Sequence, residues 1–328
     1  MPFNIQVNQL IMHSQIYIAI CAASAGSVLC FGTPKVSSMV FGAALAVALL
    51  GVPHGGLDHW TGRRLLHQRF GITWWMIFFP VYLLVSCLFA FGWFAFPITT
   101  VVLFFIISAW HFGREDQHAT ASRSARLQRQ FAFDHVSAAA VGGLVIWIPS
   151  LVRPEEMQSL LHLIVPGNGF ESAGLIVDVT QVIAVLAIPL ASLTLLRRLI
   201  QTPRDCERWT PLATAAVAVS MPILISFTIY FCFWHSWLGL QRLRRAESLT
   251  IPQFARSIAP LSVVAIIGIA LAGWWLQGSA AEVALQGQTS LLLQALFIGL
   301  SAIAVPHLFL HELDSHLSRS HSHALVCA

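Results

Sequence analysis

The chain has 328 residues, of which 57% are hydrophobic and only 10% are charged. Roughly a quarter of the residues in a soluble domain are charged, so this composition excludes an ordinary water-soluble protein and predicts an all-α, polytopic integral membrane protein. Lysine and arginine outnumber aspartate and glutamate only slightly, by 18 to 14, and this balance argues against a nucleic-acid partner.

Long apolar runs predict the membrane spans. A helix needs about 20 apolar residues to cross the hydrocarbon core, and by this measure the chain has roughly 9–10 transmembrane segments. The run over residues 211–240 is too long for one span and contains Pro222, so we expect two shorter helices that turn at Met221-Pro222. The spans are expected near residues 16–33, 37–54, 73–96, 97–112, 134–152, 173–196, 211–240, 258–276 and 289–310.

Short arginine-rich segments follow several of these spans. Segments rich in lysine and arginine favour the cytoplasmic side of a membrane. Alternating spans place all of these segments on that side if the run over residues 211–240 crosses twice, and both termini then lie in the cytoplasm, with Lys35 outside. The arginines are Arg63, Arg64, Arg69, Arg114, Arg123, Arg126, Arg129, Arg197, Arg198, Arg204, Arg208, Arg242, Arg244 and Arg245.

Four histidines, His54, His111, His235 and His307, lie near the ends of predicted spans. The predicted topology places all four near the cytoplasmic end of their helices. An imidazole at membrane depth needs a polar partner, and neutral imidazole is a common ligand of transition metals. Four such residues at one level predict a metal centre between helices. Imidazole suits Fe(II), Zn(II) and Cu, so the residues alone leave the metal open.

These histidines also have structural interpretations. Asp58 lies four residues after His54, so on a continuing helix it shares that face, where it either caps a helix-end histidine or orients a metal ligand from behind. His111 and His235 have aromatic neighbours and also suit the belt of aromatic and polar residues at the membrane surface.

Other histidines are weaker candidates. His311 lies four residues after His307 and is the alternative fourth ligand, although the following Glu312 and Asp314 indicate emergence into water. The remaining histidines near arginine-rich loops are expected to be solvated: His59, His67, His118 and His135. Aromatic residues crowd the segments around two of the four ligand candidates and suit either packing or a slot for a flat, conjugated, apolar ligand: Phe104, Phe105, Trp110, Phe112, Phe231, Phe233, Trp234 and Trp237.

Four motifs occur in the order of one known family. They are Pro53-His54-Gly55-Gly56-Leu57-Asp58, Trp110-His111-Phe112-Gly113, Tyr230-Phe231-Cys232-Phe233-Trp234-His235-Ser236 and Val305-Pro306-His307. From about residue 45 to about residue 312, the chain resembles the Brp/Blh family of membrane β-carotene 15,15′-dioxygenases. The resemblance implies an all-helical membrane bundle that cleaves the central double bond of β-carotene with O₂, giving two all-trans-retinal molecules.

The resemblance also implies a cofactor and a domain plan. Iron, Fe(2+), is expected at His54, His111, His235 and His307, with Asp58 supporting the ligands from behind. Residues 1–36 form an extra N-terminal span, residues 37–312 the catalytic transmembrane domain, and residues 313–328 a polar, weakly ordered tail. The resemblance further implies a multi-pass protein of the bacterial plasma membrane with its metal near the cytoplasmic side, and it is compatible with a functional link to a microbial rhodopsin.

One position departs from the family pattern. Members of this kind carry a second histidine four residues after the one that matches His235, and here that position is Gly239. Either His307 completes the metal site, or the chain has reduced or altered activity.

Other functions are also compatible with these residues. Facing pairs of helical histidines suit a bis-histidine haem protein in electron transfer, although four separate segments near one level argue against it. A non-catalytic regulator of an opsin that binds carotenoid or retinal is a further alternative, which Gly239 favours. Oxidative cleavage of a carbon–carbon double bond needs a redox metal, which excludes Zn(II) for the dioxygenase.

Overall fold

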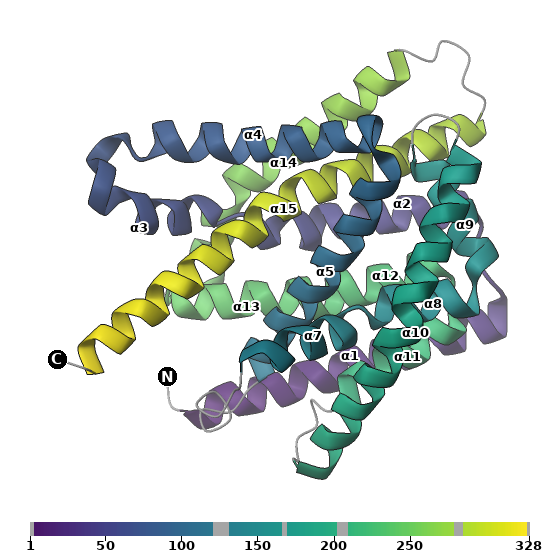
Figure 1. Ribbon diagram of the computed structural model, residues 1–328, viewed down its shortest axis with the longest axis horizontal. Helices are drawn as coiled ribbons and strands as arrows, with labels where there is room; N and C mark the ends of the chain where they lie inside the picture. The colour runs from purple at the N-terminus through teal and green to yellow at the C-terminus, as the bar shows by residue number, and fades with distance from the viewer. Residues whose placement is uncertain (1–2, 121–130, 166–168, 202–208, 279–284, 327–328) are drawn as a thin grey trace.

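A computed structural model describes residues 3–120, 131–165, 169–201, 209–278 and 285–326, and every regular element in these ranges is helical (Figure 1). The predicted all-α membrane bundle is confirmed. Among the described residues, eight helices are long and apolar enough to cross a membrane, or nine if one bent pair counts as a single span.

The first half of the chain contains α1 (Phe3–Phe31), α2 (Val36–Ala46), η1 (Val47–Gly51), η2 (Val52–Gly55), α3 (Asp58–Phe70), η3 (Gly71–Thr73), α4 (Trp75–Ala95), α5 (Pro97–Thr120), α7 (Phe131–Gly142), α8 (Leu144–Val152) and α9 (Pro154–Ile164). The second half contains α10 (Gly169–Gln201), α11 (Thr210–Ser220), α12 (Ile223–Thr228), η5 (Ile229–Ser236), α13 (Trp237–Ala246), α14 (Ile251–Gly278) and α15 (Leu285–Val326).

The long apolar run over residues 211–240 divides where expected. Helix α11 ends at Ser220, Met221 is extended with φ −107° and ψ 157°, and α12 begins directly after Pro222. At 1.5 Å per residue, the eleven residues of α11 cover only about 16 Å, which is too short for a hydrocarbon core of about 30 Å. The run is therefore a short helix followed by one full span, α12–η5–α13, rather than two spans of equal length.

The C-terminal segment differs from its prediction. Residues 313–328 were expected to form a weakly ordered tail, but α15 continues as a helix to Val326. No glycine or proline follows Pro306, so the sequence contains no strong helix breaker after that position. The polar composition that predicted a tail is equally compatible with a helix that leaves the apolar bundle.

Ion pairs join four helices at one end of the bundle. Arg64 contacts Asp314 at 2.6 Å and Glu247 at 3.8 Å. Arg114 lies 3.4 Å from Glu312, and Arg242 pairs with Glu115. We call these seven residues the charged rim: Arg64, Arg114, Glu115, Arg242, Glu247, Glu312 and Asp314.

The charged rim confirms that the arginine-rich segments in α3, α5 and α13 share one end of the molecule. Its cytoplasmic orientation stays a prediction from the positive-inside rule. Arg123, Arg126, Arg129, Arg204 and Arg208, which also entered that prediction, lie outside the described residues.

The N-terminal helix α1 is packed into the bundle. Tyr17 is fully buried, and its hydroxyl lies 2.8 Å from Oγ1 of Thr214 on α11. The ring of His13 stacks on Trp234 with 5.1 Å between ring centroids. These contacts make α1 a support for the η5 segment.

The charged rim makes topology testable. Reporter fusions after Arg64, after Arg244 and at the C-terminus should all report the same side of the membrane, because ion pairs hold these segments together. A reporter at Lys35 should report the other side, since the turn between α1 and α2 lies at the opposite end of the bundle from the C-terminus (Figure 1). Opposite signals after Arg64 and Arg244 would contradict the ion pair between Arg64 and Glu247.

Candidate metal centre

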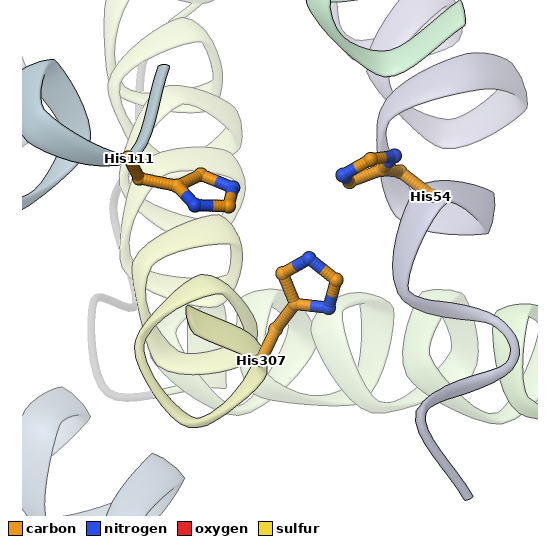
Figure 2. A group of neighbouring side chains, drawn as sticks. All are labelled: His54, His111 and His307. Atoms are coloured by element: carbon orange, nitrogen blue, oxygen red, sulfur yellow. The ribbon is translucent and has the colours of Figure 1, made fainter. Parts of the chain in front are cut away.

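The four predicted ligand histidines meet inside the bundle. His54 comes from η2, His111 from α5, His235 from η5 and His307 from α15. The rings of His54 and His111 point toward each other from opposite sides, with His307 between them (Figure 2). Ring centroids are 5.0 Å apart for His54 and His307 and 5.7 Å apart for His307 and His111. His235 closes the ring at 5.1 Å from His111 and 5.3 Å from His54.

The sequence predicted a helix end for all four histidines, but only His54 stands near the end of its segment, because η2 ends at Gly55 while α15 continues to Val326 beyond His307. Helix α5 continues to Thr120 beyond His111, and α13 carries the η5 span on to Ala246 beyond His235. His235 and His307 are 2% and 5% exposed. Burial to this degree excludes the interpretation of His235 as a residue of the membrane-surface belt.

Two ring nitrogens in this cluster are buried without a hydrogen-bond partner. They are Nδ1 of His54 and Nε2 of His235. An unsatisfied buried polar atom costs about 1–3 kcal/mol. The candidate ligand atoms of His54, His111 and His307 all lie within 4.8 Å of one another. A metal ion at the centre of the cluster would give these nitrogens a partner, so the donor set fits a transition metal that prefers imidazole.

The carboxylate of Asp58 fixes the orientation of the His307 ring by a hydrogen bond to its Nδ1. Nδ1 of His307 lies 2.8 Å from Oδ1 of Asp58, and the Tyr82 hydroxyl donates to Oδ2 of Asp58 at 2.9 Å. Asp58 is 3% exposed and accepts from both groups. A proton held on Nδ1 leaves Nε2 of His307 free to bind a metal, which is the usual role of such a pair.

Asp58 acts on a different histidine from the one that its spacing indicated. The sequence placed it on a helical face shared with His54. The 3₁₀ segment η2 ends at Gly55, and α3 begins only at Asp58, so the helix does not continue between them. The break turns the carboxylate toward α15 and His307.

A second carboxylate, which our sequence analysis missed, holds His235. Oδ1 of Asp116 lies 3.1 Å from Nδ1 of His235. Oδ2 accepts hydrogen bonds from the Tyr230 hydroxyl and from Nε1 of Trp234, each at 2.9 Å. Asp116 lies within a candidate span, and a carboxylate at that depth is a functional candidate by default. That signal alone was available from the sequence.

Two π-helical turns carry the backbone through the site. One is η1, directly before His54, and the other is η5, which contains His235. They pack together closely, because a Cβ atom on Gly51 would lie 2.6 Å from Cε1 of Phe231. Such turns insert an extra residue into a helix, redirect side chains and are frequent at functional sites.

Gly239 is the position where the family pattern has a further histidine. A Cβ atom at this position would lie 1.9 Å from Cε1 of His54. Any side chain at this position would therefore overlap the His54 ring. In this chain the space next to α13 is filled by His54 itself, and His307 provides the fourth imidazole of the cluster.

The other histidines lie outside this group. His311 is 4.4 Å from His307 between ring centroids, and its Nε2 is 3.5 Å from Oδ1 of Asp58, so Asp58, His307 and His311 form a second group that could hold a metal ion. His135 was expected to be solvated. Instead its Nδ1 accepts from Nε1 of Trp110 at 3.0 Å, because α7 packs it beside α5.

A sequence model described as beta-carotene 15,15′-dioxygenase matches residues 45–313. The match covers most of the chain and includes all four histidines, Asp58 and Asp116. The chain belongs to the β-carotene 15,15′-dioxygenase family. Helix α1 lies outside the matched region.

Two curated relatives of this chain are named as β-carotene 15,15′-dioxygenases. One, from an uncultured marine bacterium (66A03), is named beta-carotene 15,15′-dioxygenase; it is 25% identical over 271 residues, which cover 80% of this chain and 90% of the relative. The other, from Halobacterium salinarum, is named probable beta-carotene 15,15′-dioxygenase Blh; it is 24% identical over 258 residues, covering 70% of this chain and 72% of the relative. No solved structure gives a significant match.

The two aspartates should act through the histidines that they hold. Asp58→Ala and Asp116→Ala should each weaken metal binding by about 10–100-fold, the usual effect of losing a partner behind a ligand. Titration of the purified variants with a divalent metal measures this. Asp314→Ala, which loses only a contact of the charged rim, is the matched control and should bind as wild type does. Equal affinities for all three variants would mean that neither aspartate orients a ligand.

Gly239 should tolerate no side chain. Gly239→Ala should displace the His54 ring and sharply reduce metal binding, because overpacking at a buried site costs about 1–3 kcal/mol and here the overlap falls on a ligand. Gly268→Ala is the control, since a Cβ atom there meets nothing within 4 Å. Metal content measured on both variants after insertion into membranes separates the two. Full metal content in Gly239→Ala would show that His54 has room to move.

Proposed function

We propose that the chain cleaves the central double bond of β-carotene with O₂, giving two all-trans-retinal molecules, and that His54, His111, His235 and His307 hold an iron ion for this reaction. The observation that carries the proposal is the closed ring of four imidazoles in a member of this family, two of them with a buried nitrogen that lacks a partner.

When bound, Fe(II) supplies the one-electron redox chemistry that the reaction of O₂ with an alkene needs and that Zn(II) lacks. The protein supplies the positions. Asp58 and Asp116 each hold a proton on Nδ1 of a histidine, so Nε2 of that ring faces the centre of the cluster. Both carboxylates are engaged in this way, and the reaction requires no general acid or base.

The pocket beside the cluster suits an apolar, conjugated substrate. Phe104, Phe112 and Phe231, which the sequence left open between packing and a ligand slot, line it together with the four histidines. A second apolar cavity continues from it and shares Phe104, Phe112 and Phe227 with it. These walls exclude water from the site and offer aromatic faces to a polyene chain. Trp110 and Trp234 instead donate hydrogen bonds to His135 and Asp116.

The alternatives find less support. A bis-histidine haem needs a flat space for the porphyrin between two opposed imidazoles, whereas here each of the four rings has two other imidazoles with centroids 5.0–5.7 Å away. The alternative of a non-catalytic regulator was based on Gly239 as the position of a missing ligand. The ring of His54 occupies the space beside Gly239, so this glycine no longer favours that alternative.

The proposal also covers the boundaries of the catalytic unit, its orientation in the membrane and the fate of the product. The catalytic unit spans residues 37–312, with α1 as an added support. The charged rim faces the cytoplasm of a bacterial plasma membrane, by the positive-inside rule. Retinal released into the membrane would be available to a microbial rhodopsin.

The ligand set has a direct test. Replacing His54, His111, His235 or His307 by Ala should each lower bound iron and abolish retinal formation in a β-carotene-producing bacterium, because each substitution removes one imidazole from the ring. His59→Ala and His311→Ala should retain both, since neither ring is one of the four imidazoles that close the cluster. Iron is measured in the purified protein and retinal by pigment extraction.

Three results would contradict this assignment. A mild His307→Ala together with a fatal His311→Ala would mean that His311 is the fourth ligand. Wild-type protein with full retinal output and no iron would rule out the metal. Apocarotenals of other lengths in place of retinal would show eccentric cleavage.

A further inference from the structure

A large apolar space lies at the lipid-facing side of α14 and is separate from the phenylalanine cavities. It is a groove of about 360 Å³ between α2, α14 and α15. The two cavities lined by phenylalanine measure only about 80 and 50 Å³. Only the groove reaches the roughly 300–1,000 Å³ expected of a preformed ligand site.

Small residues create this groove. Ala44 and Ala48 come from the α2 side, Ala270 and Gly273 from α14, and Ala295 from α15. The helices are close neighbours (Figure 1), yet the short side chains leave the space between them unfilled. Trp274 is the one lining residue with a polar side-chain atom, its indole N–H, and the other lining residues are aliphatic or glycine, so the groove suits hydrocarbon.

The groove is open toward the bilayer because α14 is the least buried of the eight candidate spans. Only 6% of its apolar window is buried in the bundle, compared with 56% for α15 and 72% for the η5 span. A molecule dissolved in the membrane therefore meets the groove without crossing a packed helix interface.

The groove also touches the metal centre. Val52 lines both the groove and the histidine pocket, and it lies two residues before His54 in η2. Val52 is 6% exposed, so the two spaces adjoin at a buried residue.

We propose that this groove admits the substrate: a long conjugated hydrocarbon enters from the bilayer between α14 and α15 and passes Val52 to reach the histidines. The proposal rests on the proposed function, and it names the face of the protein through which that site is loaded. Phospholipid acyl chains are the competing occupant, and the experiment separates them from carotenoid.

Filling the groove should hinder loading without disturbing the metal. Ala48→Phe and Ala270→Phe should each lower kcat/KM for β-carotene supplied in phospholipid vesicles by about tenfold or more. The new ring takes up space that the polyene would occupy, and a misfit of one methylene in an apolar pocket already changes kcat/KM by about 10–200-fold. Bound iron should stay at the wild-type level. Gly42→Phe on α2 and Gly268→Phe on α14 are matched controls whose new side chains meet open space, and they should stay within about twofold of wild type.

A second measurement identifies the occupant without using turnover. A photoreactive benzophenone amino acid at position 270, irradiated in vesicles that contain β-carotene, should give an adduct with the mass of the carotenoid. The same group at position 268 should give only phospholipid adducts.

The outcomes separate the two proposals. Full activity in both filled variants, with only phospholipid adducts at position 270, would overturn the groove and leave the dioxygenase reaction standing. A wild-type protein that forms no retinal but still yields the carotenoid adduct would overturn the reaction and retain the groove.

Discussion

The structure depends on how the ring nitrogens of four buried histidines obtain polar partners away from water. A buried ring nitrogen without a partner is costly, and four rings in one cluster multiply that cost. Two of them are anchored by carboxylates, His307 by Asp58 and His235 by Asp116. Each anchor joins segments far apart in sequence, by 249 and 119 positions. The carboxylates therefore orient the rings and also tie α3 to α15 and α5 to η5.

These two anchors have the same construction. Tyrosine donates to the second oxygen of each carboxylate, Tyr82 to Asp58 and Tyr230 to Asp116. The chain contains only three tyrosines, so two of them serve this purpose. A buried carboxylate needs several donors, and a phenol supplies one without adding a second charge. The repeated Tyr–Asp–His arrangement explains why so few polar residues suffice in such an apolar chain.

The sequence predicted the large features because they follow from composition. Apolar length located the spans, and histidines at span depth located the metal candidates. It could not predict which partner Asp58 would hold, because that depends on a helix break between Gly55 and Asp58. It missed Asp116, which follows His111 by five positions and anchors a ring from another helix. The π-helical turns η1 and η5 have no reliable sequence signal, because tertiary packing decides them.

Gly239 shows the limit of a family pattern. Read as a motif, the glycine is a missing ligand; in the structure a side chain there would overlap His54. A ring of four imidazoles remains because His307 comes from a different helix.

The histidine cluster lies between two unlike environments along the bundle. Glu115 of the charged rim lies one helical turn beyond His111, and Asp314 lies two turns beyond His307. On the other side, the pocket continues into cavities lined almost entirely by apolar residues. A hydrated metal ion is stable only on the polar side, and a long hydrocarbon only on the apolar side. The cluster lies where both can reach it from opposite directions, and that position follows from a helical bundle whose charged residues gather at one end.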